Sequence, residues 1–166
     1  MKSLFCKIEI ISTSQISKKD KKSINKICNT ELLKKQEEYQ IAKLKNRSNL
    51  ILDGNKAIMF FFNNKYIPTI KTLEQNLLNL PTVYLDSGAI GPLERGANVM
   101  APGVFKYIDQ CIEDFKKNDI VCIKIINMGI LAVGQALLDK REFKQNTTGE
   151  AIEILHIKND ELYNKY

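Results

Sequence analysis

The sequence predicts an α+β protein with two small domains, an N-terminal one over residues 1–80 and a C-terminal one over residues 81–166. Three observations indicate this. An amphipathic helical pattern lies near the start, a series of β patterns joined by tight turns follows it, and a second β-rich series begins after residue 81. A chain of 166 residues is long enough for two small domains or one of ordinary size.

The first predicted element is a helix that begins at Ser17. The segment Ser17–Asp20 has the Ser-x-x-acid pattern that caps a helix N-terminus. At about 100° per residue, apolar side chains gather on one face and lysines on the opposite face. The apolar set is Ile24, Ile27, Cys28 and Leu32, and the lysine set, here called the lysine face, is Lys18, Lys19, Lys22 and Lys26. Either a solvated surface or a phosphate-binding surface fits these lysines.

The segment after this helix has the pattern of a β meander. Glu38–Lys45 alternates with the period of a half-buried strand, and Asp53-Gly54 is typical of a hairpin turn. Ala57–Phe62 follows as an apolar strand, and Pro68 closes the series. A short helix over Thr72–Leu78 completes the first predicted domain.

The second predicted domain consists of five short strands, which favours a small, partly closed barrel. A hairpin joins the third and fourth strands through a short glycine-containing turn. The five segments are residues 82–85, Val99–Val104, Asp119–Ile126, Ile130–Leu138 and Ala151–Ile157.

The most informative segment is Leu85–Val104. It predicts a tight turn at Asp86–Gly88, a short helix that ends where Gly96 takes the left-handed conformation, and a strand bent by Pro102-Gly103. Positions without side chains let a second backbone approach closely, and a sugar-phosphate chain is one such partner. The alternative is that each glycine only forms a local turn.

As an ordered string, this segment resembles the signature of the PUA domain, the RNA-binding module of pseudouridine synthases and archaeosine transglycosylases. The resemblance continues through a basic turn and two strands to about residue 163. The whole chain resembles the malignant T-cell-amplified sequence (MCTS) family of translation machinery-associated proteins. The segments that carry this likeness are Phe60–Phe62 ahead of Tyr66–Thr69, Ser87–Gly103 and His156–Tyr163.

The resemblance implies an N-terminal α/β pre-PUA domain followed by a PUA-type β pseudo-barrel. It also implies binding to the small ribosomal subunit, with rRNA and tRNA as RNA partners and a density-regulated-protein homologue as protein partner. Proteins of that family act in non-standard translation initiation, in reinitiation and in the release of tRNA after termination. With the lysine face, the expected RNA-binding residues are Asp86, Ser87, Gly88, Ala89, Arg95, Gly96, Ala97, Asn98, Met100, Ala101, Pro102 and Gly103.

One departure from the family pattern is Gly91-Pro92, which falls where relatives carry better helix formers. Proline fits only the first helical turn, so we expect a shorter or shifted helix here.

Charge divides the chain unevenly. Residues 1–80 hold 15 basic and 7 acidic side chains, a net +8, whereas residues 81–166 hold 10 and 12, a net −2. The first half is therefore expected to meet a polyanion. The longest apolar run has six residues, well below the roughly 20 needed to span a bilayer. With no signal-peptide pattern at the N-terminus, we expect a cytoplasmic protein without a membrane partner.

Nothing in the sequence indicates catalysis. His156 is the only histidine, and its place in an alternating strand favours a structural role. The cysteines have no metal-ligand spacing and are expected to be buried and reduced; they are Cys6, Cys28, Cys111 and Cys122. We therefore expect a binding protein that is not an enzyme and has no cofactor or metal.

Two alternatives remain open. A PUA protein of this size could be a ribosome-biogenesis factor that binds precursor rRNA. It could also be a protein-interaction adaptor in which Phe60–Phe62 dock a partner.

Overall fold

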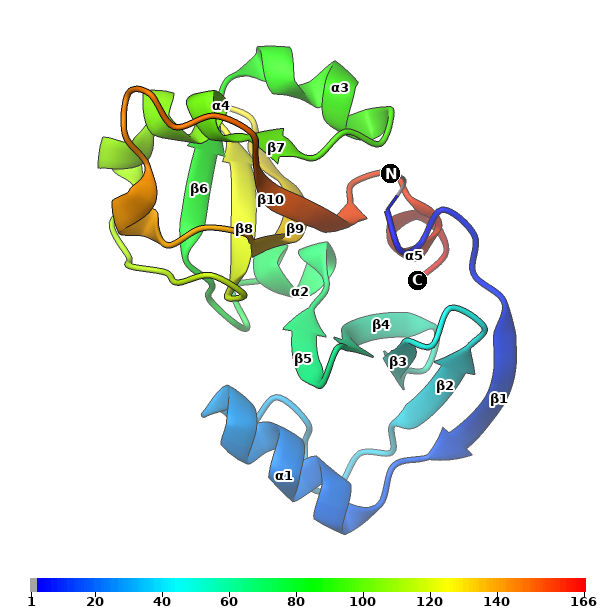
Figure 1. The fold of residues 1–166 in the computed structure, drawn as a ribbon. Helices are drawn as coiled ribbons and strands as arrows, with labels where there is room; N and C mark the ends of the chain where they lie inside the picture. Colours follow the sequence, from blue (N-terminus) through cyan, green and yellow to red (C-terminus); the bar gives the residue numbers. More distant parts are fainter. Residues whose placement is uncertain (1–2) are drawn as a thin grey trace. The chain divides into compact units, whose positions relative to one another are not determined.

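The computed structural model describes residues 3–166, which form two compact units (Figure 1). The barrel unit comprises the N-terminal residues up to Cys6 together with Asn79–Asp160, and the meander unit comprises Lys7–Leu78 together with Glu161–Tyr166. Each unit is thus completed by a segment from the opposite end of the chain. The α+β fold class predicted from the sequence is confirmed.

The meander unit contains a five-stranded antiparallel sheet in the order β1-β2-β3-β4-β5. The strands are β1 Ile10–Gln15, β2 Gln40–Leu44, β3 Asn49–Asp53, β4 Lys56–Phe62 and β5 Lys65–Pro68. Strand β1 is not predicted by the sequence, because its residues show no apolar–polar alternation; in the structure all six are exposed. Phe60 is fully buried in β4, so the adaptor hypothesis is wrong to count its side chain among docking residues.

Helix α1 spans Lys18–Cys28 and begins as predicted, with the Asp20 amide donating to Ser17 Oγ at 3.1 Å. It ends at Asn29, which adopts the left-handed conformation. Ile27 is 65% exposed, so its assignment to the buried face is wrong. The buried face of α1 is therefore narrower than predicted.

A lysine, Lys21, lies on this buried face of α1. The Lys21 ammonium donates to three backbone carbonyls of the loop that follows α1, those of Lys34, Lys35 and Glu37, at 3.4, 3.1 and 2.7 Å. A buried charge needs such partners, and here they fold the loop back against the helix. The core beneath is formed by Ile16, Ile24, Leu33, Tyr39, Ile51 and Met59.

Two short helices complete the meander unit. Helix α2 spans Ile70–Glu74 and is capped by Thr69, whose hydroxyl accepts from the Thr72 amide. Helix α5 spans Glu161–Lys165 at the C-terminus. The Ile8 amide donates to Glu161 Oε2 at 2.7 Å, which fastens α5 within this unit.

The barrel unit contains a five-stranded mixed sheet in the order β6-β8-β9-β10-β7, in which only β6 and β8 are parallel. The strands are β6 Thr82–Leu85, β7 Val99–Met100, β8 Ile120–Ile125, β9 Gly129–Ala136 and β10 Glu150–Ile157. The predicted β8–β9 hairpin is confirmed.

Short helices connect these strands: η1 Ser87–Ala89, α3 Ile90–Glu94, α4 Ala101–Lys106, η2 Ile108–Gln110 and η3 Lys140–Glu142. The predicted strand over Val99–Val104 is wrong beyond Met100, because α4 begins at Ala101. Pro102 lies in the first turn of α4, where its missing amide hydrogen is tolerated and its fixed φ suits a helix. Pro92 likewise lies in the first turn of α3.

His156 has the structural role expected of it. It is fully buried, and its Nδ1 lies 2.8 Å from Asp160 Oδ2. The same oxygen accepts from the Ile157 amide at 3.0 Å and from Ser3 Oγ at 3.2 Å. This cluster fastens the N-terminal residues to the end of β10, together with a hydrogen bond from the Leu4 amide to the Leu155 carbonyl.

The cysteines are free thiols in different environments. Cys111 and Cys122 are buried as predicted, Cys28 is half-buried, and Cys6 is exposed, which corrects its predicted burial. Burial raises the pKa of Cys122 to about 11. Within residues 3–166, no helix is long and apolar enough to cross a membrane.

Candidate nucleic-acid interface

The predicted RNA-binding segment begins where β6 ends. Asp86 caps helix η1, since its Oδ1 accepts from the Gly88 amide at 3.0 Å. Its other oxygen, Oδ2, lies 3.0 Å from the Nζ of Lys106, at the C-terminal end of α4. The structure therefore brings the turn after β6 and helix α4 together, although about 20 residues separate them in sequence.

The ion pair sets the charge of this region. The Lys106 ammonium holds the pKa of Asp86 below its ordinary value, mainly through their hydrogen bond, and the same contact raises the pKa of Lys106. A carboxylate repels phosphate, so neutralisation by Lys106 makes this surface more compatible with RNA. Lys106 was not among the predicted site residues, because only the fold brings it to Asp86.

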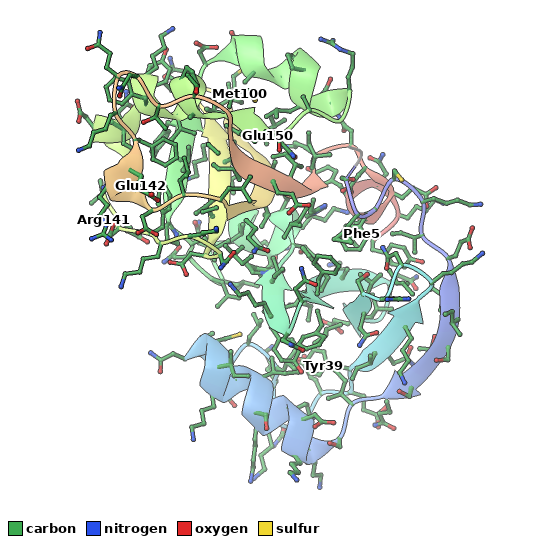
Figure 2. All side chains as sticks on the ribbon, in the orientation of Figure 1. Phe5, Tyr39, Met100, Arg141, Glu142 and Glu150 are labelled. Carbon is green, nitrogen blue, oxygen red and sulfur yellow. The ribbon has the colours of Figure 1, made fainter. Side chains whose placement is uncertain are left out.

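Most of the predicted segment is accessible. Met100 is about half exposed and lies opposite Glu150 in the β7–β10 pairing (Figure 2). Asp86, Ala89, Gly96 and Asn98 are half-buried. The exposed members are Ser87, Gly88, Arg95, Ala97, Met100, Pro102 and Gly103.

Two predicted site residues serve the fold. Ala101 is fully buried and its amide donates to the Gly149 carbonyl at 2.8 Å, so its side chain does not reach the surface. The side chain of Asn98 bridges to β10, with Oδ1 accepting from the Ile154 amide at 3.1 Å and Nδ2 donating to Glu150 Oε2 at 3.3 Å.

The glycines of this region differ in what they do for the fold. Gly96 has φ +98° and ends α3, as predicted, with its amide donating to the Leu93 carbonyl. Gly103 has no such requirement: its φ lies outside the left-handed region, and a Cβ there would meet Leu85 Cδ2 at an ordinary 3.7 Å. The packing of the barrel unit therefore leaves room for a side chain that the sequence does not supply.

Gly91 lies beneath an arginine. A Cβ at this position would come within 3.1 Å of Arg95 Nη1, so the guanidinium folds back over the glycine one turn earlier in α3. Arg95 is exposed, and its guanidinium donors are of the kind that bind phosphate oxygens.

The lysine face lies on α1 of the meander unit, and all four of its side chains are exposed. Among the described residues, none of the four forms an ion pair with a carboxylate. Lys21, on the same helix, is buried instead and was not predicted to have a role. The hydrogen bonds of Lys21 cannot be read from helical periodicity, because its three acceptors belong to a loop.

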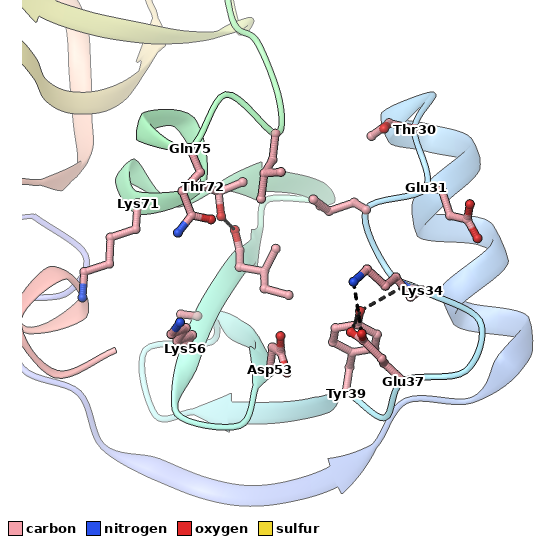
Figure 3. Close-up of a pocket in the computed structure, with 14 residues that line it drawn as sticks. Thr30, Glu31, Lys34, Glu37, Tyr39, Asp53, Lys56, Lys71, Thr72 and Gln75 are labelled. Atoms are coloured by element: carbon pink, nitrogen blue, oxygen red, sulfur yellow. Dashed lines mark hydrogen bonds and ion pairs between the residues drawn. The ribbon is translucent and has the colours of Figure 1, made fainter.

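A concave region of about 380 Å³ also lies in the meander unit, between the loop after α1, the β3–β4 hairpin and α2 (Figure 3). Its charges balance, with three lysines and three carboxylates around it, and Lys34 Nζ pairs with Glu37 Oε1 at 3.2 Å. It therefore offers a polyanion no net attraction. Across residues 3–166, no group of three or more His, Cys, Asp or Glu side chains could hold a metal ion.

Comparisons with known proteins identify the fold of the barrel unit. The family model for the PUA domain of elF2D matches residues 80–161, which cover the sheet and short helices of the barrel unit. A conserved PUA domain protein from Thermoplasma acidophilum has a similar structure, with a TM-score of 0.68, 25% identity, and coverage of 92% of this chain and 98% of that one.

Sequence relatives extend over both units. Protein MJ1432 of Methanocaldococcus jannaschii is 34% identical over 95% of this chain and 98% of its own length. Translation machinery-associated protein 20 of Eremothecium gossypii is 30% identical over 81% of this chain and 76% of its own length. The malignant T-cell-amplified sequence 1 homolog of Drosophila melanogaster is 31% identical over 80% of this chain and 74% of its own length. This chain therefore belongs to the family of translation machinery-associated protein 20 and malignant T-cell-amplified sequence 1, and its barrel unit contains a PUA domain.

Proposed function

We propose that this protein is an RNA-binding translation factor of the cytoplasm that associates with the small ribosomal subunit and does not catalyse a reaction. Its roles would be in non-standard initiation, reinitiation and tRNA release after termination, together with a density-regulated-protein homologue. The name of one relative, translation machinery-associated protein 20 of Eremothecium gossypii, supports a place in translation.

The observation that carries the proposal is the surface around Gly103. This glycine is exposed on α4 beside the turn after β6, and the fold does not require a glycine there. Close approach of a second backbone explains it, and an RNA end held through shape and backbone contacts would approach in this way. Arg95 and the exposed Ser87, which carries a hydroxyl, supply donors for phosphate and ribose oxygens.

The lysine face supports a second, sequence-independent contact. Four exposed cations on one helix attract a phosphate backbone through release of its counterions, and the meander unit holds most of the positive charge of the chain. The two contacts differ in character: one depends on backbone shape and the other on charge.

Co-sedimentation with purified small ribosomal subunits tests the proposal. We expect the full chain to pellet with mature subunits at low salt and to bring a density-regulated-protein homologue with it from native extract. Gly103→Leu should weaken the association while the fold is retained, because its side chain would occupy the space proposed for RNA.

Three outcomes would contradict the proposal. Binding to precursor rRNA but not to mature subunits would assign the protein to ribosome biogenesis. A tight protein complex without RNA affinity at low salt would favour the adaptor hypothesis, now limited to the half-buried Phe61 and Phe62. Turnover of an RNA substrate by the purified protein would make it an enzyme.

A further inference from the structure

The lysine face is not a uniform surface. A cavity of about 280 Å³ lies between α1 and the loop that follows it. Lys18 and Lys22, one helical turn apart, line this cavity from α1, and Lys35 lines it from the loop. Lys19 and Lys26 do not line it. The structure thus divides the four lysines into a pair at the cavity and a pair outside it.

The charge of the cavity is strongly positive. Four lysines line it, Lys18, Lys21, Lys22 and Lys35, against one carboxylate, that of Glu31. The exposed ammonium groups of Lys18, Lys22 and Lys35 form no ion pair with a carboxylate among the described residues. Lys21 donates to loop carbonyls, so it contributes charge without a free donor direction.

The shape of the cavity is fixed by hydrogen bonds. The Asn25 side chain forms a two-way bridge to Leu33: Nδ2 donates to the Leu33 carbonyl and Oδ1 accepts from the Leu33 amide, both at 2.8 Å. Leu33 is fully buried, so apolar core lies directly behind this side of the cavity. Apolar core close behind a charged site lowers the local dielectric constant, which strengthens the attraction between an ammonium group and an anion.

We propose that this cavity binds one phosphate group of an RNA backbone through Lys18, Lys22 and Lys35. The inference rests on the proposed function, in which the lysine face meets rRNA. Pockets for whole small-molecule ligands begin at about 300 Å³, so this cavity fits a group the size of a nucleotide's phosphate and sugar. Lysine ammonium groups bind phosphate as compact point charges with rotatable donors.

A matched pair of double variants tests the proposal. Lys18→Gln/Lys22→Gln and Lys19→Gln/Lys26→Gln remove the same charge from exposed positions of the same helix. We expect the first pair to weaken binding to a 12-residue oligouridylate and to small ribosomal subunits about tenfold, and the second pair no more than about threefold. Far-ultraviolet circular dichroism and thermal unfolding check that both variants are folded.

The outcomes separate the cavity from the wider function. An equal loss for both pairs would overturn the cavity site while leaving RNA binding by a general lysine surface. No loss for either pair, with the unmodified chain still bound to subunits, would overturn both the cavity and the contribution of the lysine face. An unmodified chain that binds neither RNA nor subunits would overturn the proposed function itself.

Inorganic phosphate provides a second readout. In amide NMR spectra, phosphate should shift the Asn25 and Leu33 signals saturably in the unmodified chain and not in Lys18→Gln/Lys22→Gln. Oligouridylate should compete for the same signals. Saturable phosphate shifts that neither oligouridylate nor subunits displace would assign the cavity to free phosphate and overturn the RNA assignment.

The carboxylate at the cavity gives a test of opposite sign. Glu31→Gln should strengthen oligouridylate binding about two- to threefold, because it removes the negative charge facing the phosphate. Glu38→Gln makes the same change to net charge at an exposed position that does not line the cavity. Equal changes in oligouridylate affinity for the two variants would contradict a phosphate bound in the cavity.

Discussion

Lys106 Nζ lies 3.0 Å from Asp86 Oδ2, and this contact joins the end of helix α4 to the turn that follows β6. Asp86 also accepts from the Gly88 amide, so one carboxylate orders the turn and fixes a lysine at the proposed RNA surface. The pair explains how an acidic side chain, that of Asp86, can lie on the surface proposed to bind RNA.

Replacement of Lys106 should therefore change the titration of Asp86. The lowered pKa of Asp86 means that its ion pair is fully formed above the ordinary carboxyl pKa and is lost as the pH falls through the lowered value. In Lys106→Gln, the pKa of Asp86 should rise toward its ordinary value. Carbon-detected NMR titration of the carboxyl group measures this, with Lys116→Gln as a control that leaves the Asp86 contact intact. An unchanged Asp86 pKa in Lys106→Gln would show that the pair does not form in solution.

Gly103→Ala should separate stability from binding. A helical alanine is more stable than glycine by about 1 kcal/mol, and the new Cβ has ordinary van der Waals room, so the free energy of unfolding should stay constant or rise. RNA affinity should fall, because the methyl group lies where a second backbone is proposed to approach. Chemical denaturation and filter binding measure the two effects, and undiminished RNA affinity would count against this surface.

Gly134→Ala is the matched contrast in the same unit. A Cβ at Gly134 would lie 2.6 Å from the Glu153 carbonyl oxygen and 2.6 Å from Ile152 Cγ2, between two paired strands. We expect a loss of about 1–3 kcal/mol in the free energy of unfolding through overpacking. An unchanged free energy of unfolding, measured by chemical denaturation, would mean that β9 and β10 can move apart locally without loss of stability.

Charge reversal of the lysine face should abolish co-sedimentation with small subunits. The variant carries Lys18→Glu, Lys19→Glu, Lys22→Glu and Lys26→Glu. If each of the four lysines neutralises its own phosphate in the unmodified protein, the log–log slope of affinity against salt should be roughly −3, and a phosphate shared by Lys18 and Lys22 in the cavity would make the slope shallower. Reversal of Lys116 and Lys117 to Glu, exposed on the barrel unit, controls for net charge in part. Unchanged pelleting of the four-residue variant would mean that the lysine face is only solvated.

Lys21 and Lys22 are neighbours with opposite environments. Lys21→Met removes the donor to three carbonyls of the loop after α1, and we expect a loss of about 1–3 kcal/mol in stability. Lys22→Met, at an exposed position, should change stability by less than about 0.5 kcal/mol. Thermal unfolding compares them, and equal melting temperatures would refute a structural role for the buried ammonium.

Thiol labelling should follow the order of exposure. At pH 8 in the folded protein, iodoacetamide should modify the exposed Cys6 first, while Cys122 stays unmodified because it is buried and its pKa of about 11 keeps it protonated. Peptide mass spectrometry after timed quenching measures the order. Labelling of Cys122 at the rate of Cys6 would show that the barrel unit opens readily; labelling in denaturant confirms that both thiols can react.

Local patterns were sufficient for much of the fold. The Ser17 cap, the hairpin turn at Asp53-Gly54 and the left-handed Gly96 depend on neighbouring residues, so they could be predicted from sequence. Strand β1 and the strand-to-helix change at Met100 could not. The first has no alternating pattern, and the second depends on how the backbone passes from the β10 pairing into α4.

The sequence by itself determined the α+β class, the order of most strands, the excess of positive charge in the first half and the glycine-rich segment that carries the family likeness. Only the tertiary structure decided which of these residues share a surface. The Asp86–Lys106 pair, the two-way bridge between Asn25 and Leu33, and the exchange of terminal segments between the units join residues distant in sequence. Such contacts arise from chain closure and packing, which residue spacing along one helix or strand does not encode.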